Sequence, residues 1–380
     1  MAETDTSGTN PWFDMKKSSP ILLLLCLLCV PMSQAQSVPP LKLIQTIDLP
    51  NLEGYLDHMS ADIKGQRLFV PGEYQQTLEI VDLRTGKVIR SISSFGGHPR
   101  TAIYIPASNE IWVDDADGSC KVFSGDSYEL VRTIELTGLG KDSKKTPDNA
   151  IYDPSSGLMY VAVTAGSAGP EANGSIEIVD TRTSKYLGGI ALHGKVPAGI
   201  ALDRDTARMF VVLADTGQVE VLDRVKRSVI AEWPVVGGPV PHAAAIDAAN
   251  HRLFIGSRIQ PGHLYKPGKL IVMDTETGKI VQSLDSEGGP DELEYDAPSR
   301  RIYFTGTTGA VEVFEQVDSD HYKSLGRVAT GAIAKTSLLV PELKQFYVGV
   351  PKHVILTPPI PQAKEETVED AKILVFEVTP

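Results

Sequence analysis

The chain has 380 residues, a formal net charge of −12 and an isoelectric point near 5.2. That length suggests two or three domains, unless internal repeats form one large closed array. The acidic balance and the lack of a long basic run exclude nucleic acid and an anionic membrane surface as expected partners.

The first 35 residues have the pattern of a secretory signal. Met15-Lys16-Lys17 is basic, Ile21–Val30 is apolar, and Ser33-Gln34-Ala35 offers small residues for cleavage. The apolar run is shorter than the ~20 residues that a membrane-spanning helix needs. We expect residues 1–35 to be a signal region with its true start at Met15 and cleavage near Ala35. The mature chain is then periplasmic or secreted and has no transmembrane segment; an uncleaved anchor is the alternative.

After the signal region, one short strand pattern recurs seven times. Each copy combines β-branched, aromatic or long aliphatic residues, which suits a buried strand. The copies are Leu68-Phe69-Val70, Ile111-Trp112-Val113, Met159-Tyr160-Val161, Met209-Phe210-Val211, Leu253-Phe254-Ile255, Ile302-Tyr303-Phe304 and Phe346-Tyr347-Val348. Successive copies are 43 to 50 residues apart.

A second strand follows in every unit, and a turn follows most of these strands. The second strands are Leu78–Val81, Cys120–Phe123, Ile176–Val179, Val219–Leu222, Leu270–Met273, Val311–Phe314 and Ile373–Phe376. The clearest turns are Asp82–Gly86 and Asp274–Gly278, where Asp can bond its own backbone and Gly tolerates positive φ. Blades 2 and 6 depart from this turn motif. Each unit is therefore predicted to be a meander of four antiparallel strands, A to D.

A period of 40 to 50 residues with four strands per unit is typical of a β-propeller. The last unit stops at its third strand, Ile373–Val378, and Leu41–Leu49 resembles fourth strands such as Leu130–Leu136. We therefore predict an all-β, seven-bladed propeller over residues 41–380, closed by the N-terminal strand completing the last blade. Closure removes an exposed sheet edge. We expect a monomer; two separate β domains are the alternative.

The strands and the Asp-Thr-x-Thr-Gly278 turn resemble the YVTN-repeat, YncE-like propellers of secreted bacterial proteins. The resemblance covers nearly all of residues 41–380. It is specific for the fold, whereas members of the group differ in function. It implies that the A strands line a central channel. It also implies that their starts share one face with the B–C loops, which carry the insertions Ala165–Gly174, Gln260–Gly268 and Lys352–Asp370.

Polar residues occupy most of these A-strand starts, so the channel mouth is the predicted ligand-binding site. The candidates are Asp57, His58, His98, Arg100, Asp148, Asn149, His242, Asp291, Glu292 and Lys335. One interpretation is a divalent metal ion, with His58, His242 and Asp291 as candidate ligands. A second is a wet channel whose polar groups bond one another. A third is acid–base catalysis by His and a carboxylate, for instance on a lactone.

The sequence favours a non-enzymatic scaffold that binds an unknown small molecule, peptide or protein over the loop-rich face. The absence of Cys-x-x-Cys-His excludes covalent haem of that type, and the absence of Gly-x-Ser-x-Gly excludes the common serine-hydrolase elbow. Two alternatives stay open. One is a metal-dependent or acid–base hydrolase, similar to a lactonase, at the channel mouth. The other is a structural protein of the cell surface.

Overall fold

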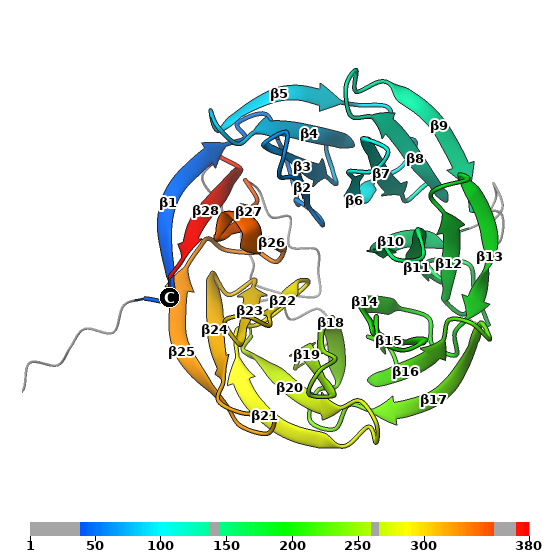
Figure 1. Ribbon diagram of the computed structural model, residues 1–380, viewed down its shortest axis with the longest axis vertical. Helices are drawn as coiled ribbons and strands as arrows, with labels where there is room; N and C mark the ends of the chain where they lie inside the picture. Colours follow the sequence, from blue (N-terminus) through cyan, green and yellow to red (C-terminus); the bar gives the residue numbers. More distant parts are fainter. Residues whose placement is uncertain (1–38, 137–143, 170, 260–265, 353–369, 380) are drawn as a thin grey trace, which may run out of the picture. The chain divides into compact units, whose positions relative to one another are not determined.

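The computed structural model describes residues 39–136, 144–169, 171–259, 266–352 and 370–379. In these residues, strands β1 to β28 and one 3-10 helix, η1 (Pro341–Leu343), form seven sheets of four antiparallel strands. The sheets follow one another around a central axis (Figure 1). The predicted all-β, seven-bladed propeller is confirmed. The signal region lies outside the described residues.

Each blade begins with an inner strand, which forms one edge of its sheet and lies nearest the axis (Figure 1). The inner strands are β2 (Ser60–Asp62), β6 (Pro99–Ile105), β10 (Thr146–Asp153), β14 (Pro197–Leu202), β18 (Val240–Asp247), β22 (Leu293–Asp296) and β26 (Ser337–Val340). The second strands are β3 (Arg67–Gly72), β7 (Glu110–Asp115), β11 (Leu158–Thr164), β15 (Arg208–Leu213), β19 (Arg252–Arg258), β23 (Arg301–Gly306) and β27 (Gln345–Val350). Because an edge strand leaves half of its backbone groups without a partner in its own sheet, side chains can bind them, as Glu294 binds the Leu339 N–H.

The third and fourth strands complete each blade outward. The third strands are β4 (Thr77–Asp82), β8 (Ser119–Ser124), β12 (Ser175–Asp180), β16 (Gln218–Asp223), β20 (Gly268–Asp274), β24 (Ala310–Gln316) and β28 (Lys372–Val378). The outer strands are β5 (Lys87–Ile92), β9 (Leu130–Glu135), β13 (Lys185–Ala191), β17 (Ser228–Pro234), β21 (Ile280–Ser286), β25 (Tyr322–Ala329) and β1 (Leu41–Asp48). All the strands predicted from the repeat therefore lie in the second or third strand of a blade.

The aspartate turns explain why third strands such as β4 and β20 reverse where they do. Asp82 Oδ1 accepts hydrogen bonds from the backbone N–H of Arg84 and Thr85, both at 2.9 Å. Gly86 closes the turn with a φ of +63°, a conformation that most other residues adopt only with strain. The same local chemistry recurs at Asp274, whose Oδ1 accepts from the N–H of Thr277 at 2.8 Å.

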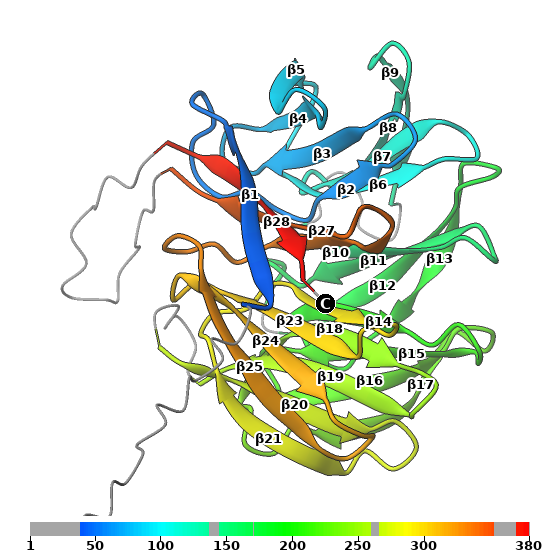
Figure 2. The ribbon, with the colours of Figure 1, turned by 60° about the vertical axis from the view of Figure 1, so that its left-hand side comes forward.

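The two ends of the chain build one blade together. β1 pairs with β28 in antiparallel register, from Leu41 opposite Val378 to Asp48 opposite Lys372, and the two strands lie side by side (Figures 1 and 2). The sheet order is β1-β28-β27-β26. The predicted completion of the last blade by the N-terminal strand is thus what the structure has.

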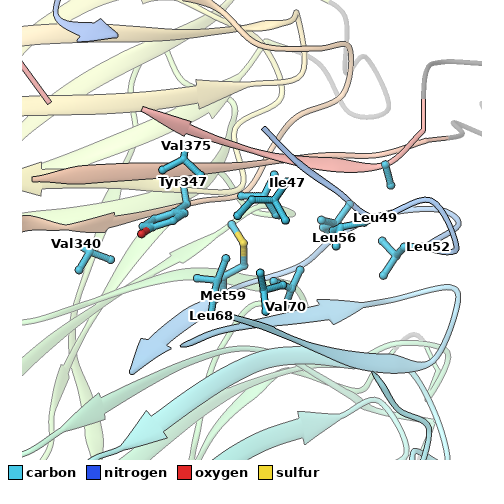
Figure 3. Close-up of a cluster of buried hydrophobic side chains, with 13 residues drawn as sticks. Ile47, Leu49, Leu52, Leu56, Met59, Leu68, Val70, Val340, Tyr347 and Val375 are labelled. Atoms are coloured by element: carbon cyan, nitrogen blue, oxygen red, sulfur yellow. The ribbon is translucent and has the colours of Figure 1, made fainter. Parts of the chain in front are cut away.

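Apolar side chains between neighbouring blades form seven core clusters in the described residues, one at each blade–blade junction. Figure 3 shows the junction of the first and last blades, where Ile47 of β1 lies near Leu68, Val70 and Tyr347. Ile47 is fully buried. The closing strand is therefore held by hydrophobic packing as well as by its ladder of hydrogen bonds.

Candidate functional site

The starts of the inner strands meet at one end of the channel. They are tied to one another by side-chain bonds to backbone: Thr101 Oγ1 donates to the carbonyl of Asp148 at 2.9 Å, and Thr336 Oγ1 to that of Leu56 at 3.1 Å. Because neighbouring strands are antiparallel, the second strands end at this same face. Charged residues from both sets of strand ends therefore face one another around the mouth.

The first ion-pair cluster is centred on Arg100. Its Nη1 atom lies 2.7 Å from Glu73 Oε1, 3.3 Å from Asp57 Oδ2 and 3.8 Å from Asp148 Oδ1. Burial lowers the pKa of Arg100, but the carboxylates of Asp57, Asp148 and Glu73 raise it by more. Burial also raises the pKa of Glu73 and of Asp148. One guanidinium thus serves three carboxyl groups from blades 1 and 3.

The second cluster is centred on Asp291. Its carboxylate contacts His242 Nδ1 at 2.9 Å, Arg258 Nη2 at 3.6 Å and Lys335 Nζ. Burial raises the pKa of Asp291, but Lys335, His242 and Arg258 lower it well below its usual range. Burial and the nearby Arg258 charge lower the pKa of His242, which leaves a neutral imidazole at pH 7. Lys335 Nζ also lies 5.2 Å from the centre of the Tyr55 ring.

His58 links Asp57 of the first cluster to Glu292, the residue that follows Asp291 in the chain. Its Nδ1 atom is 2.5 Å from Glu292 Oε2, and its Nε2 atom is 3.5 Å from Asp57 Oδ1. Burial lowers the pKa of His58, but Glu292 and Asp57 raise it, and the result is a pKa of about 10. His58 is therefore an imidazolium at neutral pH, and its pairing with Glu292 joins blade 1 to blade 6. The charged network takes residues from every blade except the fourth, where Val196-Pro197-Ala198 supplies none.

Two predicted site residues lie apart from this network. The Nδ1 atom of His98 is 2.8 Å from the carbonyl oxygen of Glu73, and its ring lies 6.1 Å from that of Tyr74. Tyr74 in turn packs against Tyr55 at 5.5 Å. His98 thus belongs to an aromatic group on the rim. Asn149 lines the cavity described below.

Four ionisable residues of the site were not predicted: Glu73, Arg258, Asp114 and Glu294. Glu73 and Arg258 lie at the ends of second strands. A charged residue at that position of the repeat could therefore have identified them as residues of the channel mouth. Asp114 is fully buried, with Oδ1 accepting the Thr101 N–H at 2.8 Å. Burial raises its pKa well above the usual range. No sequence pattern marks Asp114 or Glu294.

A cavity of about 460 Å³ lies inside the channel, between the inner strands of blades 3 to 7. Its lining includes Asn149, Asp291, Glu292 and Glu294 on the polar side, together with Ile151, Ile200, Leu202, Ile246 and Leu338. Its volume is typical of sites for small organic ligands. A larger cavity of about 610 Å³ lies between β1 and blade 1 and includes none of the predicted site residues.

A metal ion does not fit the described residues. In them, no group of three or more His, Cys, Asp or Glu side chains is arranged to hold one. Of the three candidate ligands, His242 and Asp291 contact each other, whereas His58 pairs with Glu292. The ligand atoms of the three candidates are therefore engaged in two separate ion pairs rather than turned toward a common point.

Acid–base chemistry has one matching feature. His242 is neutral and is held by the Asp291 carboxylate, which is how a general base is oriented. Lys335 and Arg258 already neutralise that carboxylate, however. Within the described chain, the His242 ring makes no hydrogen bond to a hydroxyl or thiol group.

Part of the predicted rim falls outside the described residues. Residues 260–265 and 353–369 make up most of the insertions Gln260–Gly268 and Lys352–Asp370. Within the described residues, the site consists of strand ends and short loops. The described residues include no helix long and apolar enough to cross a membrane.

The fold and the channel define a seven-bladed β-propeller with a charged mouth. Over 211 residues the chain is 23% identical to the "Uncharacterized protein YncE" of Salmonella typhimurium and 24% identical to the protein of that name from Salmonella typhi. Each match covers 54% of this chain and 53% of the relative, so the chain spans about half the length of these curated relatives. No family model matches.

Solved structures share the architecture at low sequence identity. The RRP9 WD40 repeats match with a TM-score of 0.70 and 9% identity, covering 90% of this chain and 99% of that one. A chain of the Mitotic Checkpoint Complex matches with a TM-score of 0.68 and 12% identity, covering 99% of this chain and 100% of that one. Hydrazine synthase of Kuenenia stuttgartiensis matches with a TM-score of 0.63 and 16% identity, covering 78% of this chain and 94% of that one. The predicted resemblance is confirmed: the chain is a seven-bladed propeller with weak sequence similarity to YncE, and the solved structures share its fold.

Proposed function

We propose that the protein is a non-enzymatic binding protein that takes a small organic ligand into the channel cavity. The observation that carries this proposal is the cavity of about 460 Å³, which has apolar and charged lining residues from five consecutive blades. Sites for small ligands combine an apolar wall with a few polar groups in this way.

The charged mouth supports the same function. Its side chains are already paired, so they form a rigid and polar entrance rather than a reactive one. Preformed polar groups select a ligand at a low cost in conformational entropy. The likeness to propeller scaffolds supports binding in general, and the ligand is identified here by chemistry alone.

The test fills the cavity. Asn149 lines it, and its side chain has no recorded hydrogen bond among the described residues. We expect Asn149→Phe to fold as the wild type does, by circular dichroism, but to lose stabilisation by ligands. A wild-type protein held at 100 times its Kd gains about 2.7 kcal/mol from a bound ligand. Thermal-shift screening of cationic, neutral and anionic organic compounds measures this gain.

Two outcomes contradict the proposal. In the first, no compound of any charge raises the melting temperature of the wild-type protein. In the second, the compounds that do so stabilise Asn149→Phe equally, which places their site outside the channel.

We also propose that the chain is exported to the periplasm or the medium. The support is the basic, apolar and small-residue sequence pattern from Met15 to Ala35. Mass spectrometry of the protein purified after cell fractionation is expected to find a mature N-terminus at Gln36 in the periplasmic or secreted fraction. A cytoplasmic protein that retains residues 15–35 would overturn this proposal.

A further inference from the structure

Glu294 is the carboxyl group of the cavity that has no basic partner. It lies on β22, and its Oε1 atom accepts the backbone N–H of Leu339 on β26 at 3.1 Å. Its other oxygen has no recorded partner among the described residues, and the side chain lines the cavity. Asp291 and Glu292, by contrast, are each held by basic side chains.

The surroundings of Glu294 favour the arrival of a positive charge. Burial, and then the nearby charge of Glu292, raise the pKa of Glu294 to about 8, so the group keeps its proton at neutral pH. A ligand cation beside it would offset both effects and favour the carboxylate form.

The charged groups on the strands packed against β22 are engaged elsewhere. His58 acts on Glu294 but is paired with Glu292. The remaining titratable groups have the following partners: His242 and Arg258 bind Asp291, Asp247 binds Tyr295 and Gln316, Arg252 binds Asp274 and Asp320, and Arg301 binds the carbonyl of Thr379. The phenol of Tyr303 is buried and has no recorded partner. Glu294 is therefore left to pair with a ligand.

The rest of the cavity suits a hydrocarbon group. Five aliphatic side chains from four inner strands line it: Ile151, Ile200, Leu202, Ile246 and Leu338. Its basic lining residue, Arg204, is exposed and follows β14, in the turn at the other end of that strand from the mouth. A charged head at Glu294 with an apolar body along these walls therefore satisfies both parts of the cavity.

We propose that the channel cavity binds a primary organic ammonium ion, with its charged nitrogen on Glu294 and its hydrocarbon part against the aliphatic side chains. This inference rests on the proposed function and names the ligand class. The ammonium group donates hydrogen bonds to the free carboxylate oxygen. Charge-assisted bonds of this kind are stronger than neutral ones, so an amine is selected over an alcohol of the same shape.

The experiment compares three probes of one length, hexylammonium, 1-hexanol and hexanoate, by isothermal titration calorimetry on the full propeller. Hexylammonium is expected to bind at least about tenfold more tightly than 1-hexanol. Glu294→Gln keeps the shape of the side chain and is expected to lose at least about tenfold in affinity for hexylammonium, with 1-hexanol unaffected. Glu342→Gln, an exposed carboxyl change on η1, is the matched control and is expected to change neither affinity.

The pH dependence gives a second readout. An alkylammonium stays charged below a pH of about 10, whereas Glu294 must lose a proton to receive it. Wild-type affinity for hexylammonium is therefore expected to rise from pH 6 to about 8 and then level off. The Glu294→Gln variant is expected to show no such rise. If Glu294 had a merely structural role, its replacement would not remove the pH dependence of hexylammonium binding.

The outcomes separate this inference from the proposed function. Tighter binding of 1-hexanol or hexanoate, blocked by Asn149→Phe, overturns the ammonium assignment and leaves a channel-binding protein. Unchanged hexylammonium binding by a folded Glu294→Gln variant also overturns it. If none of the three probes binds the wild type, both proposals fail for ligands of this size.

Discussion

Asp291 is the residue on which the charged mouth depends most. It is buried, and its two carboxylate oxygens contact His242, Arg258 and Lys335 from the two neighbouring blades. The side chains of Lys335 and Arg258 are themselves only 13% and 16% exposed, so water cannot replace the carboxylate. Loss of its charge therefore leaves two buried cations without their ion-pair partner.

We predict that Asp291→Asn lowers the free energy of unfolding by about 3–5 kcal/mol, which is the usual cost of breaking a buried ion pair. Urea unfolding followed by circular dichroism measures the change. Asp285→Asn is the matched control, because its side chain is 85% exposed and pairs only with Lys269. It is expected to leave the unfolding free energy almost unchanged. Equal effects of the two substitutions would show that the mouth is not held by Asp291.

The positions of the site residues could be predicted, but their pairing could not. Counting along the repeat places Asp57, His58 and Asp291 at equivalent strand starts. Whether His58 meets Glu292 or a metal ion depends on side-chain directions across the channel, and these are set by blades far apart in the chain. Glu294 was missed because one inner-strand glutamate looks like any other until its neighbours are known.

At the scale of single elements, β1 shows how one strand carries both a buried and an exposed face. Its burial alternates only in part, with Leu41 and Ile47 buried and Leu43 and Ile44 half exposed. The register shifts between Leu43 and Gln45, which marks a β-bulge at Ile44. The strand therefore contributes to the core mainly through its two ends.

We predict that Ile47→Ala lowers the free energy of unfolding by about 2–5 kcal/mol, because it leaves a cavity in the junction shown in Figure 3. Ile44→Ala makes the same chemical change at a side chain that is 46% exposed, and its expected cost is within about 0.5 kcal/mol. Urea titrations of both variants provide the measurement. A similar loss at the two positions would contradict the role of Ile47 in closure.

Arginines at the start of four second strands, Arg67, Arg208, Arg252 and Arg301, bind the backbone of the following blade. Arg252 Nε donates to the carbonyl of Ser319 at 2.8 Å, and its Nη2 atom lies 2.5 Å from Asp320 in the following blade. Arg208 reaches the carbonyl of Thr275 in the same way, at 2.8 Å. These ties lie at the opposite end of the blades from the mouth. The channel entrance and the blade junctions are thus held by separate sets of charges.

For the whole molecule, the fold was predictable because the repeat supplies the same evidence seven times. A single Leu-Phe-Val strand is ambiguous, but seven of them at nearly constant spacing, each followed by a second strand, predict one closed array. Closure was predictable because a three-stranded last unit and an unpaired first strand complete each other. The channel cavity could not be predicted, since its volume depends on how far seven separate blades lie from the axis.

The pairing of β1 with β28 has a consequence for the order of synthesis. The first strand of the propeller to be translated binds the last, and roughly 320 residues separate Asp48 from Lys372. At about 5–20 residues per second, β1 waits on the order of tens of seconds for its partner. Throughout that time the ring cannot close. The nascent propeller therefore stays an open ring until its final strand is made, although the strands of the earlier blades are already complete.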